Sequence, residues 1–310
     1  MAKQVGTLTE LIPGIHHITA IASDPAANVR FYRDFLGLRL VKRTVNFDDP
    51  GTYHLYYGDD AGHPGTILTF FPWPGAARGR LGTGEVSVVQ FEIPKGSLGY
   101  YTQRCREVGV PSDGPESRFT GEQFLTIFDP DGMMIELVEG SEAPGGDPPK
   151  ILGFHAATIS LEGYEATAKL LTEAFGFRLT GEHGNRFRYE ARAGGLGSRV
   201  DLLCIPDARR GSMGAGTVHH IAWRTADDKT QLEWRKRLAD LGYNVTPVMD
   251  RQYFHSIYFR ERGGVLFEIA TDPPGFAIDE APAELGTHLK LPPWMEPKRR
   301  AIEQILPPLE

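Results

Sequence analysis

The chain has 310 residues, about twice the length of a typical single domain, so two domains are the starting expectation. Its 33 basic and 40 acidic residues give a net charge of -7, and the absence of any long Lys/Arg run argues against nucleic-acid or membrane-surface partners. No stretch of 18 apolar residues occurs, and residues 1–5 lack the apolar character of a signal peptide. The two cysteines, Cys105 and Cys204, fit reduced thiols, so we expect a soluble cytoplasmic protein.

The first predicted elements are a short apolar strand at residues 14–20 and a helix that follows it. Asp24 suits the N-cap of this helix and Pro25 its first position. The helix then shows one apolar face with i, i+3, i+7 spacing and ends at a glycine: Val29, Tyr32, Leu36 and Gly37. Next come β-rich runs at residues 53–57 and 66–71, separated by Gly, Asp and Pro, which indicate hairpins.

This unit of one strand, one helix and about three strands is repeated along the chain. Residues 14–20 resemble residues 153–159. In both copies a glycine lies twenty residues after the fourth residue of the segment: Gly37 after His17, and Gly176 after Ala156. A second pair aligns residues 128–136 with 260–268, and residues 86–89 align with 218–221 at the same offset. The repeats predict an α+β fold of four βαβββ modules in two tandem domains.

The predicted domain boundary lies near residue 148. Residues 140–149 are rich in Gly, Pro and acidic side chains, which is typical of a linker. The expected domains are therefore 1–148, with modules 1 and 2, and 149–310, with modules 3 and 4. From about Pro273 a tail follows, with a helix-like segment at residues 296–306.

The residues that could carry chemistry are two His-His pairs and one glutamate. Neighbours on a strand point to opposite faces, so His17 and His220 could face a common cavity with Glu268 from a closing strand. Two imidazoles and one carboxylate leave half an octahedron open, which suits iron(II) binding an organic oxygen donor and dioxygen. Manganese(II) could use the same ligands.

A histidine on a strand is often a core or surface residue with no metal, and the repeat helps to decide. The copy of His17 is Ala156 and the copy of His220 is Val88. This pattern is expected if only one of two pseudo-equivalent cavities holds a metal.

Two residues of the second cavity are interpreted as structural. Glu136 persists opposite Glu268, and we expect it to be a relic or a hydrogen-bonded carboxylate. His155 is expected to face away from the cavity, in the manner of His16.

The chain resembles the vicinal oxygen chelate superfamily and, within it, the hydroquinone ring-cleaving dioxygenases, a group that includes chlorohydroquinone and methylhydroquinone dioxygenases. The resemblance covers nearly the full length. It rests on the opening His strand and on these motifs: residues 31–37, 40–47, 53–57, 62–66, 129–136, 216–220 and 263–268.

The resemblance implies an iron(II) ring-cleaving dioxygenase that takes a small hydroquinone-type aromatic and dioxygen. It also implies curved mixed sheets that form a metal-holding cavity, with the metal between modules 1 and 4. The family's ligands fall on His17, His220 and Glu268. Its catalytic and supporting residues fall on His16, Thr19, His219, Arg251 and Tyr258. His219 or Tyr258 could move protons and Arg251 could hold an anionic oxygen.

Two of these assignments have an open alternative. The loop at residues 250–255 is shorter than in chlorohydroquinone enzymes, and structural roles remain open for Arg251 and Tyr258. Phe254, Phe267 and Trp223 could line a ring-shaped pocket or belong to the core.

Three other functions are alternatives to the predicted ring-cleaving dioxygenase. A glyoxalase-like lyase or isomerase would usually take a fourth protein ligand where this chain has Thr69, which is a poor substitute for a carboxylate. A catechol-type extradiol enzyme would draw all three ligands from the second half, which Ala156 contradicts. A non-enzymatic binding protein would need no ligand set. A homo-oligomer is left open.

Overall fold

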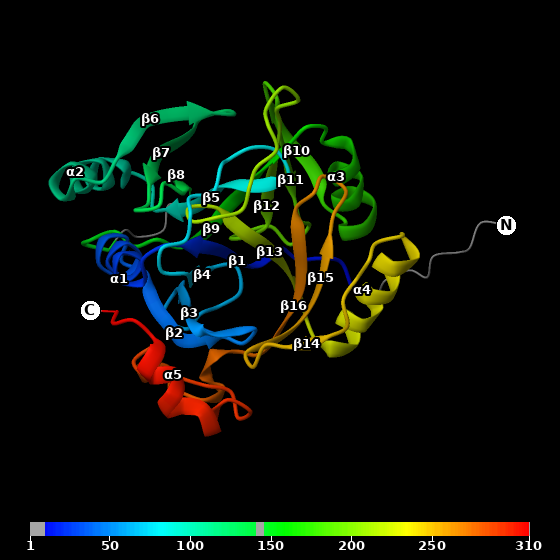
Figure 1. Cartoon of the computed structure of the whole chain (residues 1–310). Coiled ribbons are helices and arrows are strands. Elements are labelled where there is room, and N and C mark those ends of the chain that lie inside the picture. Colours follow the sequence, from blue (N-terminus) through cyan, green and yellow to red (C-terminus); the bar gives the residue numbers. More distant parts are fainter. Residues whose placement is uncertain (1–9, 141–145, 310) are drawn as a thin grey trace.

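The computed structural model describes residues 10–140 and 146–309. The prediction about residues 1–5 and the middle of the predicted linker lie outside these ranges. The described chain contains the four predicted modules, each with a strand, a helix and three further strands, so the α+β prediction is confirmed (Figure 1).

Modules 1 and 2 form the first part of the chain. Module 1 contains β1 (Ile15–Ala22), α1 (Pro25–Val29), its π-helical continuation η1 (Arg30–Phe35), β2 (Arg39–Asn46), β3 (Asp49–Gly58) and β4 (Ile67–Pro72). Module 2 contains β5 (Glu85–Ile93), α2 (Leu98–Val108), β6 (Ser112–Arg118), β7 (Glu122–Phe128) and β8 (Met134–Glu139).

Modules 3 and 4 repeat the same order. Module 3 contains β9 (Gly153–Leu161), α3 (Glu165–Lys169), the π-helix η2 (Leu170–Phe175), β10 (Arg178–His183), β11 (Arg186–Glu190) and β12 (Arg199–Cys204). Module 4 contains β13 (Val218–Thr225), α4 (Asp228–Asp240), β14 (Met249–Asp250), β15 (Phe254–Arg260) and β16 (Leu266–Pro274). The tail adds the 3-10 turns η3 (Phe276–Ile278), η4 (Pro282–Glu284) and η5 (Glu296–Lys298) before α5 (Arg299–Ile305).

The first helix begins as its sequence predicts. The Asp24 carboxylate accepts hydrogen bonds from the backbone N–H groups of Ala26 and Ala27, and Pro25 occupies the first turn. From Arg30 the helix continues with π-type turns, and Gly37 follows its end with a positive φ of 74°. The predicted start and end are therefore confirmed.

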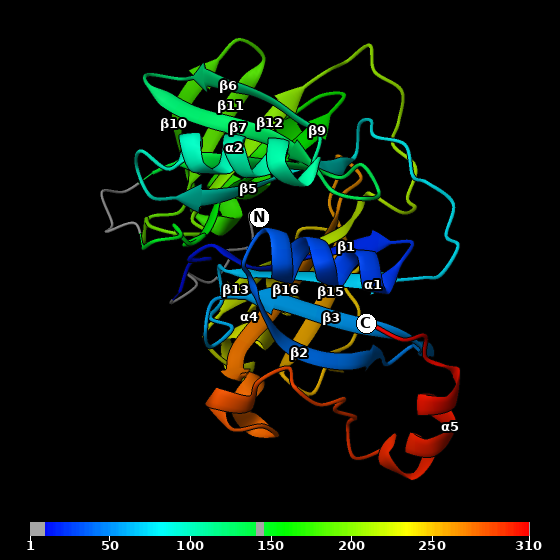
Figure 2. The same cartoon turned by 90° about the vertical axis from the view of Figure 1, so that its left-hand side faces the viewer.

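The sheets join modules that are distant in the sequence. One eight-stranded sheet has the order β14-β15-β16-β13-β1-β4-β3-β2 and therefore combines modules 4 and 1. The other has the order β10-β11-β12-β9-β5-β8-β7-β6 and combines modules 3 and 2. Figure 2 shows these sheets in the lower and upper halves of the molecule. The boundary near residue 148 stays a prediction, and both sheets cross it.

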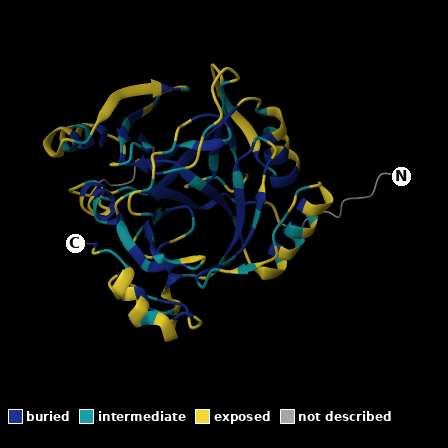
Figure 3. Ribbon diagram, in the orientation of Figure 1, coloured by how far each residue is buried: buried dark blue, intermediate teal, exposed yellow. Residues whose placement is uncertain are grey.

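The strands at the centre are buried, whereas α2, α4 and α5 expose one side to solvent (Figure 3). Trp223 and Phe267 are fully buried and pack edge to face, with ring centroids 5.2 Å apart. Of the aromatic residues left open above, these two belong to the core.

The tail packs against β2 through a buried cation. The Lys42 ammonium is fully buried and lies 2.5 Å from carboxylate oxygens of both Asp279 and Glu280. Farther along, Leu291 and Ile302 form a small apolar cluster with Val45. Among the described residues, no helix combines the length and the apolar character needed to cross a membrane.

Candidate metal centre

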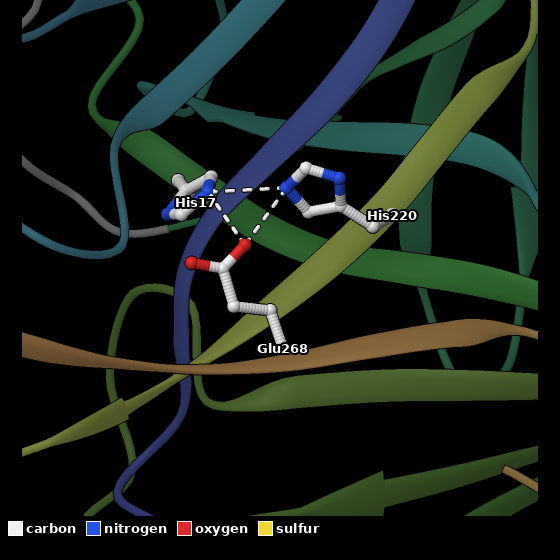
Figure 4. Close-up of side chains that lie close together, drawn as sticks. All are labelled: His17, His220 and Glu268. Carbon is white, nitrogen blue, oxygen red and sulfur yellow. Dashed lines mark hydrogen bonds and ion pairs between the residues drawn. The ribbon is translucent and has the colours of Figure 1, made fainter. Parts of the chain in front are cut away.

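The three predicted metal ligands meet in the sheet of modules 1 and 4. Strand β1 carries His17, its antiparallel neighbour β13 carries His220, and β16, which pairs with β13, carries Glu268. All three side chains are buried and converge on one point (Figure 4). The His17 Nε2 and His220 Nε2 atoms lie 3.4 Å apart. Glu268 Oε2 lies 3.4 Å from His17 Nε2 and 2.9 Å from His220 Nε2.

These distances fit donors that share one metal ion. Donors about 2.1 Å from an ion lie about 3.0 Å apart at right angles and about 3.4 Å apart at tetrahedral angles. Glu268 Oε2 is also a buried oxygen without a hydrogen-bond donor of good geometry. A buried polar atom without a partner is costly, and a cation at this point would satisfy it. Among the described residues, this is the one group that meets the distance criterion for a metal site.

The other histidine of each pair, His16 or His219, contacts the Nδ1 atom of the ligand histidine. His16 Nδ1 lies 2.9 Å from His17 Nδ1, and His219 Nδ1 lies 2.7 Å from His220 Nδ1. Burial lowers the pKa of His16 well below its usual range and lowers that of His219 to about 3, with further repulsion from the neighbouring histidine in each case. Each of these Nδ1···Nδ1 hydrogen bonds contains one proton, which one ring donates to the other. When the ligand histidine holds it, its Nε2 lone pair faces the metal position.

Ser256 orients the carboxylate. Its hydroxyl donates to Glu268 Oε1 over 2.5 Å, so the other oxygen, Oε2, faces the two imidazoles. Burial alone would raise the pKa of Glu268, but the attraction of His17 and contacts with both histidines hold it well below its usual range. The carboxylate is therefore ionised and fixed in direction.

We expect Ser256→Ala to weaken metal binding by about 10- to 100-fold, because outer partners of ligands typically contribute this much. The measurement is a competition titration with a chelator of known affinity. Ser87→Ala is the matched control, because the Ser87 hydroxyl bonds Ser160 in the other sheet. Equal affinities for the Ser256 and Ser87 variants would contradict the orienting role.

The structure also places Tyr258 and Arg251 beside the site. Tyr258 lies opposite Glu268 in the β15–β16 register, and its ring centroid is 5.8 Å from that of His220. Arg251 Nε donates to the Tyr258 hydroxyl over 3.2 Å, and Arg251 Nη1 pairs with Asp48 Oδ2 at 3.0 Å. Both predicted residues therefore line the site, and their catalytic roles stay predictions.

Thr19 belongs to a hydrogen-bond chain that includes two residues the sequence analysis missed. The Thr69 hydroxyl donates to Thr19 Oγ1 over 2.9 Å, and His54 Nε2 lies 2.8 Å from Thr69 Oγ1. The Tyr56 hydroxyl in turn lies 2.8 Å from His54 Nδ1. A signal was present: His-x-Tyr at 54–56 corresponds by register to Ser-x-Tyr at 256–258 on the equivalent hairpin.

A cavity of about 430 Å³ opens beside the ligands. Its walls combine aromatic rings with a few polar groups, which is typical of a small-molecule site. Phe254 is one of the lining rings, so this residue is the one of the three open aromatics that faces the cavity. The lining residues are His17, Asn46, Phe47, Asp48, Asp49, His54, Tyr56, Phe71, Trp73, His219, His220, Arg251, Phe254, Tyr258 and Leu266.

The pseudo-equivalent place in the other sheet holds arginines. Glu136 pairs with Gln90 in the strand register as Glu268 pairs with Ala222, which confirms the alignment of the repeats. The Arg118 guanidinium lies 2.5 Å from Glu136 Oε2. There the cation that balances the carboxylate is a side chain, which fits the structural role predicted for Glu136.

The neighbouring charges complete this network. Arg188 pairs with Asp201 at 2.7 Å and also with Glu122. His155 Nε2 lies 2.8 Å from Glu122 Oε2, and its Nδ1 lies 3.2 Å from Glu92. His155 is thus held by carboxylates within the arginine network.

Comparisons with known proteins agree with this arrangement. Residues 14–137 and 153–269 match the Glyoxalase/Bleomycin resistance protein/Dioxygenase superfamily. The chain is 50% identical over 305 residues to MhqO of Bacillus subtilis, which is named as a ring-cleaving dioxygenase, with 96% of each chain covered. It is 35% identical over 306 residues to the chlorohydroquinone/hydroquinone 1,2-dioxygenase of Sphingobium indicum, covering 93% of this chain and 94% of that one.

Solved structures share the architecture. A crystal structure described as that of a dioxygenase from Bacillus subtilis superposes with a TM-score of 0.92 at 48% identity, covering 97% of this chain and 99% of that chain. Glyoxalase I from Zea mays shares the fold, with a TM-score of 0.64 at 14% identity, over 84% of this chain and 92% of that chain. By sequence, fold and repeat structure, the chain belongs to the Glyoxalase/Bleomycin resistance protein/Dioxygenase superfamily.

Proposed function

We propose that this protein is a non-haem iron(II) ring-cleaving dioxygenase that acts on a hydroquinone-type aromatic with dioxygen. The observation that carries the proposal is the set of two imidazoles and one carboxylate, His17, His220 and Glu268, at the wall of an aromatic-lined cavity. Such a set leaves positions for both an organic oxygen donor and dioxygen. The names of the two relatives quoted above support the same reaction class.

The metal, when bound, would lower the pKa of a phenolic hydroxyl and hold the ring beside dioxygen. The cavity suits such a ring, because Phe71, Trp73 and Phe254 contribute flat apolar faces to its wall. A volume of about 430 Å³ is large enough to admit a substituted benzene ring.

The proposed roles of the surrounding residues follow from their contacts. Tyr258 accepts a hydrogen bond from Arg251, so its own O–H is available to a negative oxygen in the cavity. His219 lines the same cavity as a neutral imidazole, and when its Nδ1 accepts from His220 its own proton lies on Nε2, where it is available as a hydrogen-bond donor. His16 and Thr19 act indirectly. His16 orients His17, and Thr19 accepts a hydrogen bond from Thr69.

Iron(II) is proposed as the metal, and manganese(II) is the alternative for the same mixed N and O ligands. With it we propose a cytoplasmic location, because Cys105 and Cys204 are both free thiols. The remaining partners in the proposal are the small aromatic substrate and dioxygen.

The rival enzyme functions fit the site less well. A lyase or isomerase with a fourth protein ligand would need a donor at Thr69, whose hydroxyl bonds Thr19 and His54. A catechol-type enzyme with all ligands in the second half does not fit, because His17 lies in the first half.

The test is oxygen uptake by protein loaded anaerobically with iron(II). Hydroquinone, methylhydroquinone, chlorohydroquinones, catechol and gentisate are offered in parallel, with His220→Ala as the control. We expect uptake stoichiometric with a hydroquinone and none in the control. If the protein binds metal but takes up no oxygen with any of these substrates, the proposal is overturned in favour of a lyase or isomerase.

A further inference from the structure

Two tyrosines occupy equivalent positions on either side of the candidate metal centre. Tyr258 lies opposite Glu268 in the β15–β16 register, and Tyr56 lies opposite Thr69 in the β3–β4 register. Both rings line the cavity. Their hydroxyl groups nevertheless have different hydrogen-bond partners, and this difference decides what each can bind.

The direction of the hydrogen bonds at Tyr56 follows from counting protons. Thr69 has a single hydroxyl proton and donates it to Thr19, so Thr69 must accept from His54 Nε2. Burial, with further repulsion from His17 and His220, holds the pKa of His54 well below its usual range, so the ring is neutral and carries one proton. That proton lies on Nε2, which leaves Nδ1 as an acceptor.

Tyr56 therefore gives its own proton to His54 Nδ1, over 2.8 Å. Within the described residues its hydroxyl has no second protein partner. What Tyr56 offers to the cavity is an oxygen lone pair, so it can pair with a ligand group that donates a hydrogen bond.

Tyr258 has the opposite polarity. Its oxygen accepts from Arg251 Nε, which leaves its O–H to be donated into the cavity. The nearby guanidinium adds positive charge on this side of the cavity. Tyr258 thus suits an oxygen that carries negative charge, and Tyr56 suits an oxygen that keeps its proton.

We propose that Tyr56, oriented by His54 and Thr69, recognises the second hydroxyl of the substrate, the one that stays protonated when the first is ionised at the metal centre. This inference rests on the proposed function and deepens it. A hydroquinone has two hydroxyls, and the two tyrosines would distinguish them by their charge. Tyr56 is then a substrate-binding residue, and His54 and Thr69 are positioning residues that act through it.

The test measures ligand affinity, without turnover, by calorimetry of iron(II)-loaded protein under anaerobic conditions. The two ligands are hydroquinone and 4-methylphenol, in which a methyl group of similar size replaces one hydroxyl. We expect the wild-type protein to prefer hydroquinone at least about tenfold, because removing a ligand donor leaves a desolvated acceptor without a partner.

Tyr56→Phe should lower hydroquinone affinity about tenfold and change 4-methylphenol affinity less than about twofold, so that the preference disappears. Tyr57→Phe is the matched control, because that hydroxyl bonds Asn28 in the core and lies outside the cavity lining. If Tyr56→Phe leaves the preference unchanged, or weakens both ligands equally, the inference is wrong.

A second pair of variants tests the positioning role of His54. His54→Asn keeps an acceptor near Nδ1, and His54→Leu removes it at similar size. We expect the Asn variant to retain the preference for hydroquinone within about threefold and the Leu variant to lose most of it. Equal preferences in the two variants would show that His54 does not orient Tyr56.

Failure of this inference is distinguishable from failure of the proposed function. Wild-type protein that consumes oxygen with hydroquinone, while Tyr56→Phe keeps the wild-type preference, overturns the inference alone. Wild-type protein that holds iron yet neither binds nor oxidises hydroquinone overturns both.

Discussion

Replacing Glu268 with glutamine is expected to abolish oxygen uptake and metal retention together. The amide cannot supply the negative charge that Glu268 Oε2 places 2.9 Å from His220 Nε2. A metal centre typically contributes several kcal/mol to its reaction, so we expect activity to fall at least about 1000-fold. The measurements are metal content by elemental analysis after desalting, and oxygen uptake with hydroquinone.

Glu136→Gln is the matched control for this substitution. It makes the same chemical change at the pseudo-equivalent position, where Arg118 takes the place of the ion. We expect this variant to keep its metal and at least half of its activity. Metal retention in the Glu268 variant, or metal loss in the Glu136 variant alone, would refute the assignment of the site to modules 1 and 4.

Arg118→Met is expected to destabilise the protein by about 3–5 kcal/mol, because it leaves the buried Glu136 carboxylate without its cation. Arg118 lies 2.5 Å from Glu136 Oε2 and 2.6 Å from Glu122 Oε1, and it also donates to Gln90. Its side chain is only 5% exposed, so water cannot replace the lost partner. Urea unfolding, followed by circular dichroism, gives the change in the free energy of unfolding.

Arg33→Met provides the comparison for this experiment. Arg33 pairs with Asp34 at 2.6 Å, but both side chains are at least 40% exposed. Exposed pairs contribute about 0–1 kcal/mol, so this variant should unfold near the wild-type midpoint. Similar losses in the two variants would mean that the arginine network of modules 2 and 3 adds little stability.

The two sheets contain two versions of one arrangement, with a buried carboxylate at the same position in each. In the sheet of modules 1 and 4, Glu268 Oε2 faces the two ligand imidazoles, 2.9 Å from His220 Nε2 and 3.4 Å from His17 Nε2. In the sheet of modules 2 and 3 the equivalent carboxylate is neutralised by Arg118. One place is therefore suited to binding an ion and the other to holding the fold together.

The sequence by itself determined the modules and predicted the ligand set. Local signals were sufficient for the first helix, because Asp24 caps its N-terminus and Pro25 occupies its first turn whatever lies around it. The repeats singled out His17 and His220 as candidate ligands because their copies, Ala156 and Val88, cannot bind a metal. A comparison within one chain was enough for this step, since repeated modules keep their register.

The association of modules 1 and 4 was implied only by the family resemblance, and the tertiary structure alone decided the register of their strands and the direction of each hydrogen bond. Pairing of β1 with β13 joins segments about 200 residues apart, and no local periodicity encodes such a contact. Tyr56 and His54 were missed for a related reason. Their chemistry depends on Thr69 and Thr19 across the sheet, so it exists only after the strands are in register.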